Sequence, residues 1–278
     1  MIFCDAALAE RIERTEAARV ATGAARHGDG SFVIPIAGGY ATFAEPESPL
    51  NKVVGLGFAG TPSDTAWYEI EQAFAAGNTA VQVELSHLGD TTIGTHLTER
   101  GYRLTGFENV LGRTVDPEPT RVTPAGVEIR PSGDDELDLW LGIVVEAFTH
   151  PDTGRLVPAE EFPRGVLARA VRDLSSAVGV QRYLALCDGV PAGGASAAYA
   201  GGVAALTGAA TLPAYRRRGI QTALLSVRLS DAAAAGCDVA TVTTSPATKS
   251  QQNAQRQGFE LLYTRAILVN GVHPVSDG

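Results

Sequence analysis

The stretch Val203-Ala-Ala-Leu-Thr-Gly-Ala-Ala-Thr-Leu-Pro-Ala-Tyr-Arg-Arg-Arg-Gly219 decides the fold, together with the helix that follows it. Its first ten residues are apolar or small and predict a strand, which ends where Pro213 removes a backbone donor. From Gln221 to Ala235, apolar residues recur at helical spacing, and Gly236 ends this helix. Three adjacent arginines therefore lie between a strand and a helix.

These arginines stand at a helix N-terminus, where unpaired backbone N–H groups and the helix dipole favour an anion. Positive side chains there oppose the dipole unless a multiply charged group, such as a phosphate, lies beside them. Gly219 lets such a ligand approach the backbone closely. A solvated basic loop is the alternative interpretation, and the loop alone does not decide between the two.

The loop resembles the pyrophosphate loop of the GNAT superfamily of acyl-CoA-dependent N-acyltransferases, which has the form Gln/Arg-x-x-Gly-x-Gly/Ala. Arg216 and Gly219 match the first two marked positions, whereas Gln221 replaces the small third residue. A second family element is a helix that closes on Gly-Phe before the last strand, and residues 250–259 resemble it. The resemblance covers the second half of the chain, roughly residues 127–269.

This resemblance implies acetyl-CoA as a co-substrate, with its diphosphate held by backbone N–H groups of the loop. The coenzyme-binding residues that it implies are Thr211, Leu212, Arg216, Arg217, Arg218, Gly219, Ile220, Gln221, Thr222 and Asn253. By family position, Thr211 and Leu212 pair with the pantetheine arm. The N–H of Leu212 is the candidate donor to the oxyanion of the tetrahedral intermediate.

The first half of the chain repeats the second in order and spacing. Residues 101–111 align with 258–268 without a gap, and residues 75–86 lead through Ala-Ala-Gly into a strand as residues 234–245 do. We infer an internal duplication, in which each half contains a helix that ends at a left-handed glycine before a strand. The first-half counterpart of the arginine loop, residues 60–65, has no basic residue. Asp64 is expected to cap a helix there and to repel phosphate, so the first half is expected to bind no coenzyme.

The expected fold class is α/β (α+β), with two GNAT-like domains, each a mixed, partly antiparallel sheet flanked by helices. Prolines in Asp116-Pro-Glu-Pro-Thr120, and Pro124 soon after, predict a linker. The expected division is therefore a degenerate GNAT-like domain over 1–115, a linker over 116–126 and an acyl-CoA-binding domain over 127–278. Asp188-Gly189 and Gly201-Gly202 predict tight hairpins within the second domain.

Composition limits the classes of partner. The formal net charge of −9 disfavours a broad nucleic-acid surface, and no stretch of about 18 apolar residues predicts a membrane span. The N-terminus has no signal-peptide pattern, so a cytoplasmic location is expected. Cys4, Cys187 and Cys237 lack metal-ligand spacing, and no metal is expected. A monomer or a homodimer is compatible with the sequence.

The expected reaction is transfer of an acetyl group from acetyl-CoA to a primary amine, on a small molecule or peptide, by direct attack in a ternary complex. The alternative is an acyl-CoA-binding sensor or interaction protein without turnover. It is prompted by Ala254, which occupies the position of the tyrosine that supplies the acid in many relatives. Tyr183, Tyr215, Tyr263 and His150 are candidates for acid or base, but packing is the favoured interpretation of each tyrosine and solvent exposure that of His150. The acid and base are therefore left unassigned.

Overall fold

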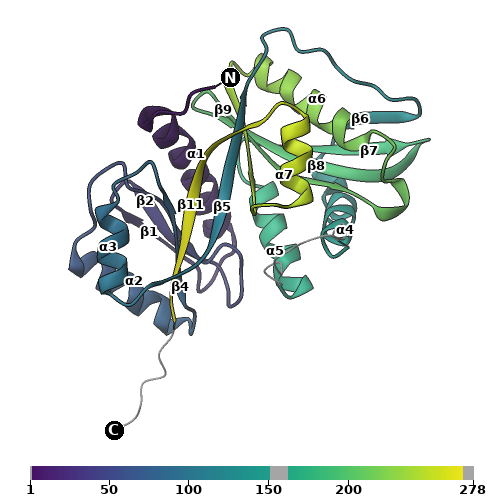
Figure 1. Cartoon of the computed structure of the whole chain (residues 1–278). Helices are drawn as coiled ribbons and strands as arrows, with labels where there is room; N and C mark the ends of the chain where they lie inside the picture. Colours follow the sequence, from purple (N-terminus) through teal and green to yellow (C-terminus); the bar gives the residue numbers. More distant parts are fainter. Residues whose placement is uncertain (1, 151–161, 272–278) are drawn as a thin grey trace.

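The structure is a computed structural model, and it describes residues 2–150 and 162–271. All strands of the described chain form one eleven-stranded sheet in the order β1-β2-β3-β4-β11-β5-β10-β9-β8-β7-β6 (Figure 1). The predicted α/β class, with mixed and partly antiparallel pairing, is confirmed.

Each half contributes helices and strands in a similar order. The first half contains α1 (Ala6–Arg26), β1 (Phe32–Ile36), β2 (Gly39–Phe43), β3 (Lys52–Leu56), α2 (Asp64–Ala76), β4 (Val81–Ser86), α3 (Thr92–Glu99) and β5 (Arg103–Thr114). The second half contains β6 (Val127–Pro131), η1 (Asp134–Glu136), α4 (Leu137–Phe148), α5 (Arg164–Ser175), β7 (Val180–Cys187), β8 (Val190–Ala200), β9 (Val203–Thr211), η2 (Pro213–Tyr215), α6 (Ile220–Ala234), β10 (Val239–Thr244), α7 (Lys249–Arg256) and β11 (Glu260–Asn270).

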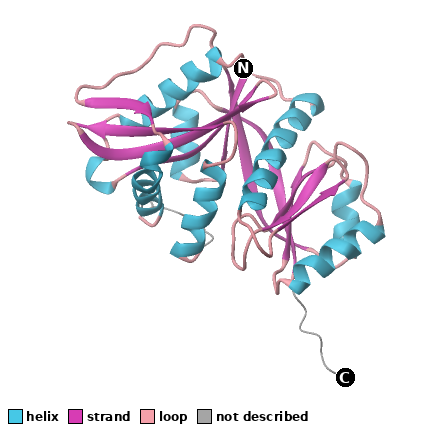
Figure 2. Ribbon diagram, turned by 180° about the vertical axis from the view of Figure 1, so that it is seen from behind, coloured by secondary structure: helices cyan, strands magenta, loops and turns pink. Residues whose placement is uncertain are grey.

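Helices cover both faces of the sheet. On one face, α6 packs on β9 and β10 through Leu224 and Ala240, and α2 and α3 pack on β3 and β4. On the other face, seen from behind in Figure 2, α4 packs on β8 and β9 through Trp140, and α1 packs against α5 and the centre of the sheet. The sheet is therefore the middle layer between two layers of helices.

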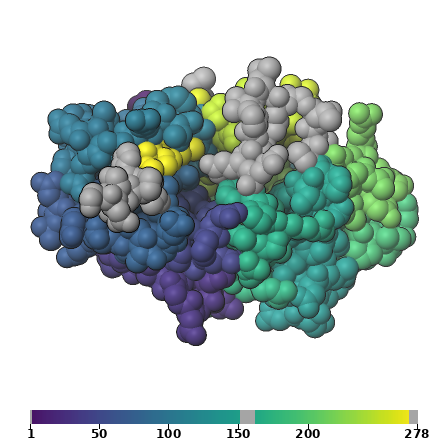
Figure 3. All heavy atoms as spheres, turned by 90° about the horizontal axis from the view of Figure 1, so that it is seen from below, coloured from purple at the N-terminus to yellow at the C-terminus, as the bar shows by residue number. Residues whose placement is uncertain are grey.

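The last strand of each half pairs with the other half. β5 pairs antiparallel with β10 of the second half, and β11 pairs antiparallel with β4 of the first. The two exchanged strands also pair with each other at the centre of the sheet. The exchange is visible in Figure 3, where yellow atoms of the C-terminal strand lie among the blue atoms of the first half. The exchange was not predicted from the sequence.

The strand registers obey the duplication inferred from the sequence. In the alignment, Arg265 corresponds to Glu108, and Ser86 corresponds to Ser245. Arg265 pairs with Ser86 in the β11–β4 ladder. Glu108 and Ser245 likewise continue the β5–β10 ladder one step beyond Asn109↔Thr244. The alignment also exchanges Glu108 and Arg265, and these two residues pair with each other in the central ladder. A pseudo-twofold axis therefore crosses the sheet at this pair, which lies at its centre.

Several local predictions can be compared with the backbone. The residues at Asp188-Gly189 and Gly201-Gly202 all have positive φ, as the predicted tight hairpins require. Gly236 ends α6 with φ 72°, as expected. Gly77 at the end of α2 has φ −87°, and Asn78 takes the left-handed conformation instead, so that part of the prediction is wrong.

Candidate functional site

Two parallel strands of the second half separate to form a fork. β9 and β10 pair from Val203↔Val239 to Ala205↔Thr241, and the remaining residues of β9 have no partner on β10. A bulge in the β8–β9 ladder lies near the start of the separation, at Gly208, which has φ 62°. The chain leaves β9 at the open end of the fork, passes through η2 and enters α6.

A buried arginine supports this bulge. The guanidinium of Arg228, on α6, donates to the carbonyl oxygens of Ser196 at 3.3 Å and Thr207 at 3.4 Å. Burial lowers the pKa of Arg228 to about 10. Sequence reasoning missed this role, although an arginine at an inward position of an apolar helix was a visible signal. Arg228 thus holds the carbonyl groups of a strand pair that borders the bulge.

The arginine loop gives α6 an open N-terminus. Arg217 and Gly219 have positive φ angles of 65° and 81°, and Gly219 occupies the cap position, where no side chain accepts from the first turn. The N–H groups of Ile220, Gln221 and Thr222 have no intrahelical acceptor, because an α-helix pairs each N–H with a carbonyl four residues earlier. The residues present therefore suit an anionic group such as a diphosphate.

The side chains of the loop point in different directions. Arg218 pairs with Asp188 at 2.9 Å, and Arg216 donates to the backbone oxygen of His150. Gln221 donates from Nε2 to Thr211 Oγ1 at 3.0 Å, so its amide is turned toward the end of β9. The bulky third residue of the motif thus links the start of the helix to the end of the strand.

The N–H of Leu212 is already engaged. It donates to the carbonyl oxygen of Ala192 on the neighbouring strand at 2.9 Å. Its predicted role as the oxyanion donor would require this N–H to leave the β8–β9 ladder, and that role stays a prediction. Because backbone groups alternate in direction along an antiparallel ladder, the N–H and C=O of Thr211 point away from β8, toward the fork. Of Thr211 and Leu212, Thr211 is therefore the residue whose backbone N–H and C=O lie on the free edge of the strand.

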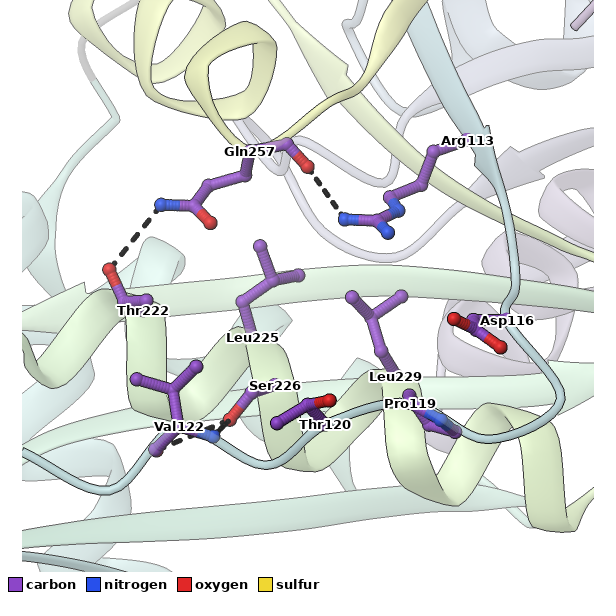
Figure 4. A pocket seen from close by; sticks show the side chains of 10 residues that line it. All are labelled: Arg113, Asp116, Pro119, Thr120, Val122, Thr222, Leu225, Ser226, Leu229 and Gln257. Carbon is purple, nitrogen blue, oxygen red and sulfur yellow. Dashed lines mark hydrogen bonds between the residues drawn. The ribbon is translucent and has the colours of Figure 1, made fainter. Parts of the chain in front are cut away.

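The linker covers one side of the loop. A Cβ added to Gly219 would lie 2.7 Å from Cγ of Pro124. Val122 donates its N–H to Ser226 of α6 at 3.0 Å, which fixes the linker along that helix. Between the linker, α6 and Gln257 lies a cavity of about 230 Å³, shown in Figure 4, and Arg113 lies at its edge. Sequence reasoning treated the linker only as a connection.

The other predicted groups are exposed or already hydrogen-bonded. Asn253 is exposed on α7. Tyr183 donates to Asp231 and Tyr263 to Glu13, each at 2.7 Å, and burial raises the pKa of both hydroxyls far above the usual value. Neither tyrosine is suited to protonate a leaving thiolate. His150 is exposed at the C-terminal end of α4.

The corresponding region of the first half is closed. β3 pairs with β4 as far as Leu56↔Leu85, and the next residue, Gly57, accepts at its oxygen from the N–H of Asp90 at 2.9 Å. The backbone therefore bridges the place where the second-half strands separate. The cap of α2 is Ser63, which accepts from Ala66, so the prediction that Asp64 caps this helix is wrong.

A set of charged side chains surrounds the pseudo-twofold axis on the α1 face, and we call it the axial charge cluster. Arg265 is at its centre and contacts Glu13 at 2.7 Å, Glu108 at 3.1 Å and Glu84 at 3.7 Å. Glu84 also pairs with Lys52 at 2.5 Å. Glu16 and Arg19, which pair at 2.6 Å on α1, complete the cluster. Burial, and then the charge of Glu84, raise the pKa of Glu108 to about 7.

Within residues 2–150 and 162–271, no helix has both the length and the apolar character needed to cross a membrane. Within the same ranges, no group of three or more histidine, cysteine or acidic side chains is arranged to hold a metal ion.

Comparisons with known proteins agree with this architecture. Residues 147–259 match the sequence profile described as the Acetyltransferase (GNAT) family. No curated protein sequence matches the chain.

Solved structures resemble nearly the whole fold. A GCN5-related N-acetyltransferase from Kribbella flavida is 18% identical with a TM-score of 0.67, and the match covers 96% of this chain and 98% of that one. A tandem GNAT protein from the clavulanic acid biosynthesis pathway is 14% identical with a TM-score of 0.63, covering 93% and 89%. At these identities, the likeness shows a shared fold.

Proposed function

We propose that the protein transfers an acetyl group from acetyl-CoA to a primary amine, because residues 147–259 match the GNAT acetyltransferase family and the fold resembles that of a tandem GNAT protein. The GNAT fold supports acyl-CoA-dependent acetyl transfer in general. The proposal adds that the amine attacks the thioester directly, while both substrates are bound.

The observation that carries the proposal is the fork between β9 and β10 with an uncapped helix N-terminus at its open end. An extended arm can lie in the fork and pair with the free edge of Thr211, as an added strand does. A diphosphate on the same molecule can then accept from the N–H groups of Ile220, Gln221 and Thr222. Acetyl-CoA combines these two parts.

The proposed coenzyme residues follow from this placement. Backbone N–H groups of the first turn of α6 hold the diphosphate, and Arg217 adds positive charge from an exposed position. Within the loop, Arg216 contacts His150 and Arg218 contacts Asp188. Gly219 is part of the proposed site because, without a side chain, its backbone can be approached closely by the diphosphate.

We also propose that coenzyme binding is confined to the second half. The closed β3–β4 junction and the acidic residue Asp64 at the start of α2 support the proposal that the first half binds no coenzyme. The proposed boundaries remain 1–115 and 127–278, joined by the linker 116–126. These boundaries follow the chain, and the exchange of β5 and β11 makes each unit depend on the other for its sheet.

The test has two steps. Calorimetry measures acetyl-CoA binding, and thiol release is then followed over a panel of primary amines, including polyamines, amino sugars and lysine peptides. The proposal expects binding and amine-dependent thiol release. Binding without release from any amine would favour a sensor, and absence of binding would exclude both functions.

A matched pair of variants locates the site. Arg217→Asn removes one positive charge and retains a residue that tolerates the left-handed backbone. It is expected to weaken acetyl-CoA binding by about tenfold, roughly 1.4 kcal/mol. Arg14→Gln removes an exposed arginine on α1 and is expected to leave binding unchanged. Equal affinities for the two variants would place the coenzyme elsewhere.

A further inference from the structure

Resting on the proposed function, we propose that Glu108, contributed by the first half of the chain, is the carboxylate that receives the acceptor ammonium and takes its proton. Glu108 lies on β5, the strand that the first half inserts beside β10. The coenzyme-free half would then complete the active site of the other half.

The strand register places Glu108 beside the fork. β10 ends at Thr244, opposite Asn109, and Glu108 is one residue beyond that end. β9 has already parted from β10 after Thr241↔Ala205. Neighbouring strands lie about 4.8 Å apart, and the fork borders β10 on the side away from β5, so it begins roughly one strand spacing from β5. At this level Ser245 continues the β10 register opposite Glu108, so the Glu108 side chain reaches the fork only over one face of the sheet.

Glu108 also lies on the face where an amine can approach. Its neighbour Asn109 points to the other face and donates to Gln251 of α7, whereas Val110 packs with Ala9 and Ile12 of α1. Alternation along the strand puts Glu108 on the α1 face with Val110. The α6 and α7 face carries the phosphate loop, so an attacking amine must come from the face that α1, α4 and α5 cover.

Burial distinguishes Glu108 from the other acids near the axis. The side chains of Glu13, Glu84 and Arg265 are 2%, 5% and 2% exposed, whereas that of Glu108 is 28% exposed. Arg265 therefore fixes the carboxylate from the inside, and the outer part remains open to a ligand. A cation that binds there needs no displacement of a buried pair.

The balance of charge leaves a place for one more cation. The axial charge cluster contains four carboxylates, from α1, β4 and β5, and three basic groups, from α1, β3 and β11. The groups that act on Glu108 are Glu84, Arg265, Lys52 and Glu16. One carboxylate is in excess, and Glu108 is the most exposed of the four acids, since the side chain of Glu16 is 18% exposed. A bound ammonium would neutralise the carboxylate of Glu108, and so would a proton transferred from that ammonium.

The equivalent position in the first half carries the opposite charge. The duplication maps Glu108 onto Arg265, which stands opposite Ser86 at the end of β4 as Glu108 stands beyond the end of β10. The β3–β4 junction beside it is bridged by Gly57 and Asp90. A carboxylate thus accompanies the open fork, and a buried guanidinium accompanies the closed one.

The proposed step is balanced in atoms and charge. An N–H bond of the ammonium breaks, and its proton moves to an oxygen of Glu108. The neutral amine attacks the thioester carbon, the C–N bond forms, and the C–S bond breaks as the tetrahedral intermediate collapses. The second amine proton goes to the sulfur, and Glu108 later releases its proton to water. A carboxylate with a pKa near 7 is suited to accept a proton at neutral pH.

The experiment compares Glu108→Gln, Glu108→Asp and the exposed control Glu128→Gln with the wild type. For each, acetyl-CoA affinity, thermal unfolding and the pH profile of kcat/KM with one active amine are measured. At pH 7, Glu108→Gln is expected to lose about 10²- to 10⁴-fold in kcat/KM and retain coenzyme affinity. Its profile is expected to lack the inflection near pH 7, and the deficit should shrink at pH 9 as more neutral amine becomes available. Glu108→Asp should retain part of the activity and the inflection.

The outcomes distinguish failure of the Glu108 inference from failure of the proposed function. An unchanged kcat/KM in Glu108→Gln, or a loss that is equal at every pH with the inflection intact, would overturn the inference and leave the proposed function standing. If the wild type binds acetyl-CoA but acetylates no amine, the proposed function fails and so does proton transfer to Glu108. Calorimetry of spermidine with the CoA complex then tests ammonium binding alone, and equal affinity in wild type and Glu108→Gln would reject that as well.

Discussion

Glu108 is buried enough for its ionisation to affect stability. Burial and Glu84 raise its pKa from 4.5 to about 7 in the folded chain, whereas the unfolded chain keeps the lower value. Between these values the folded state binds more protons than the unfolded state. The contribution of Glu108 to the free energy of unfolding therefore decreases as pH rises through this window.

We expect Glu108→Gln to remove this contribution. The difference in free energy of unfolding, variant minus wild type, should rise from pH 4.5 to pH 7, because only the wild type acquires a poorly compensated, partly buried charge. Urea unfolding at several pH values measures it. A difference that is constant across the window would mean that Glu108 titrates normally.

Ser63 gives a simpler prediction. It caps α2 by accepting from the N–H of Ala66 at 3.2 Å, so Ser63→Ala should lower the free energy of unfolding by about 1 kcal/mol. Asp64 follows the cap with an exposed side chain, which contacts His96 and Arg100. Asp64→Ala is expected to cost less, because exposed ion pairs contribute little. The reverse order in urea unfolding would contradict this assignment.

The sequence could predict some of these residues and not others. It indicated an anion site at the arginine loop, because composition and helix start coincide there. It did not reveal the contact of Glu108 with Arg265, since an alignment of the two halves does not say which strands pair. A charged residue at the same aligned position of both strands was nevertheless a signal that a buried charge pair lay there.

Among the elements, α6 contains a matched pair of left-handed glycines at its two ends. Gly219 has φ 81° and faces Pro124 of the linker, whereas Gly236 has φ 72° with no atom within 4 Å of an added Cβ. Alanine in a left-handed conformation costs about 1–2 kcal/mol. The two positions therefore share backbone strain and differ in their surroundings.

We expect Gly219→Ala to reduce both stability and acetyl-CoA affinity, the latter by at least about tenfold. Its methyl group meets Pro124 and lies at the proposed diphosphate site. Gly236→Ala should lose a similar amount of stability through strain and retain coenzyme affinity. Calorimetric binding and urea unfolding of both variants provide the comparison, and a loss of affinity in both would point to a general effect on α6.

The elements themselves were the most predictable level of this structure. Hairpin turns at Asp188 and Gly201, the strand before Pro213 and the helix after it depend on local spacing and turn residues. The linker was also visible as a run of prolines. Its position against Gly219 was not, because proline content predicts irregular backbone and does not determine where that backbone packs.

At the level of the whole molecule, the exchange of β5 and β11 joins the two halves through three antiparallel ladders. Two copies of one fold were inferred from the sequence, and the structure contains them in a single sheet. The exchange could not be predicted, because the aligned strands have the same pattern whether they pair within their own half or across it.

This topology predicts the behaviour of a cut chain. A protease site inserted in the exposed linker after Glu118 should give two fragments that remain together on gel filtration under native conditions. Separation should require denaturant, because each fragment supplies a strand to the sheet of the other. Fragments that part in buffer, each with native circular dichroism, would show that the halves are independent.

Two separate chains that exchanged their last strands in this way would assemble only as far as their concentration allowed. The linker 116–126 makes the same encounter intramolecular, with an effective concentration on the order of millimolar for a short tether. The midpoint of unfolding is therefore expected to be independent of protein concentration. In this chain, a strand-exchanged pair has become a single cooperative unit, free to specialise its two members differently.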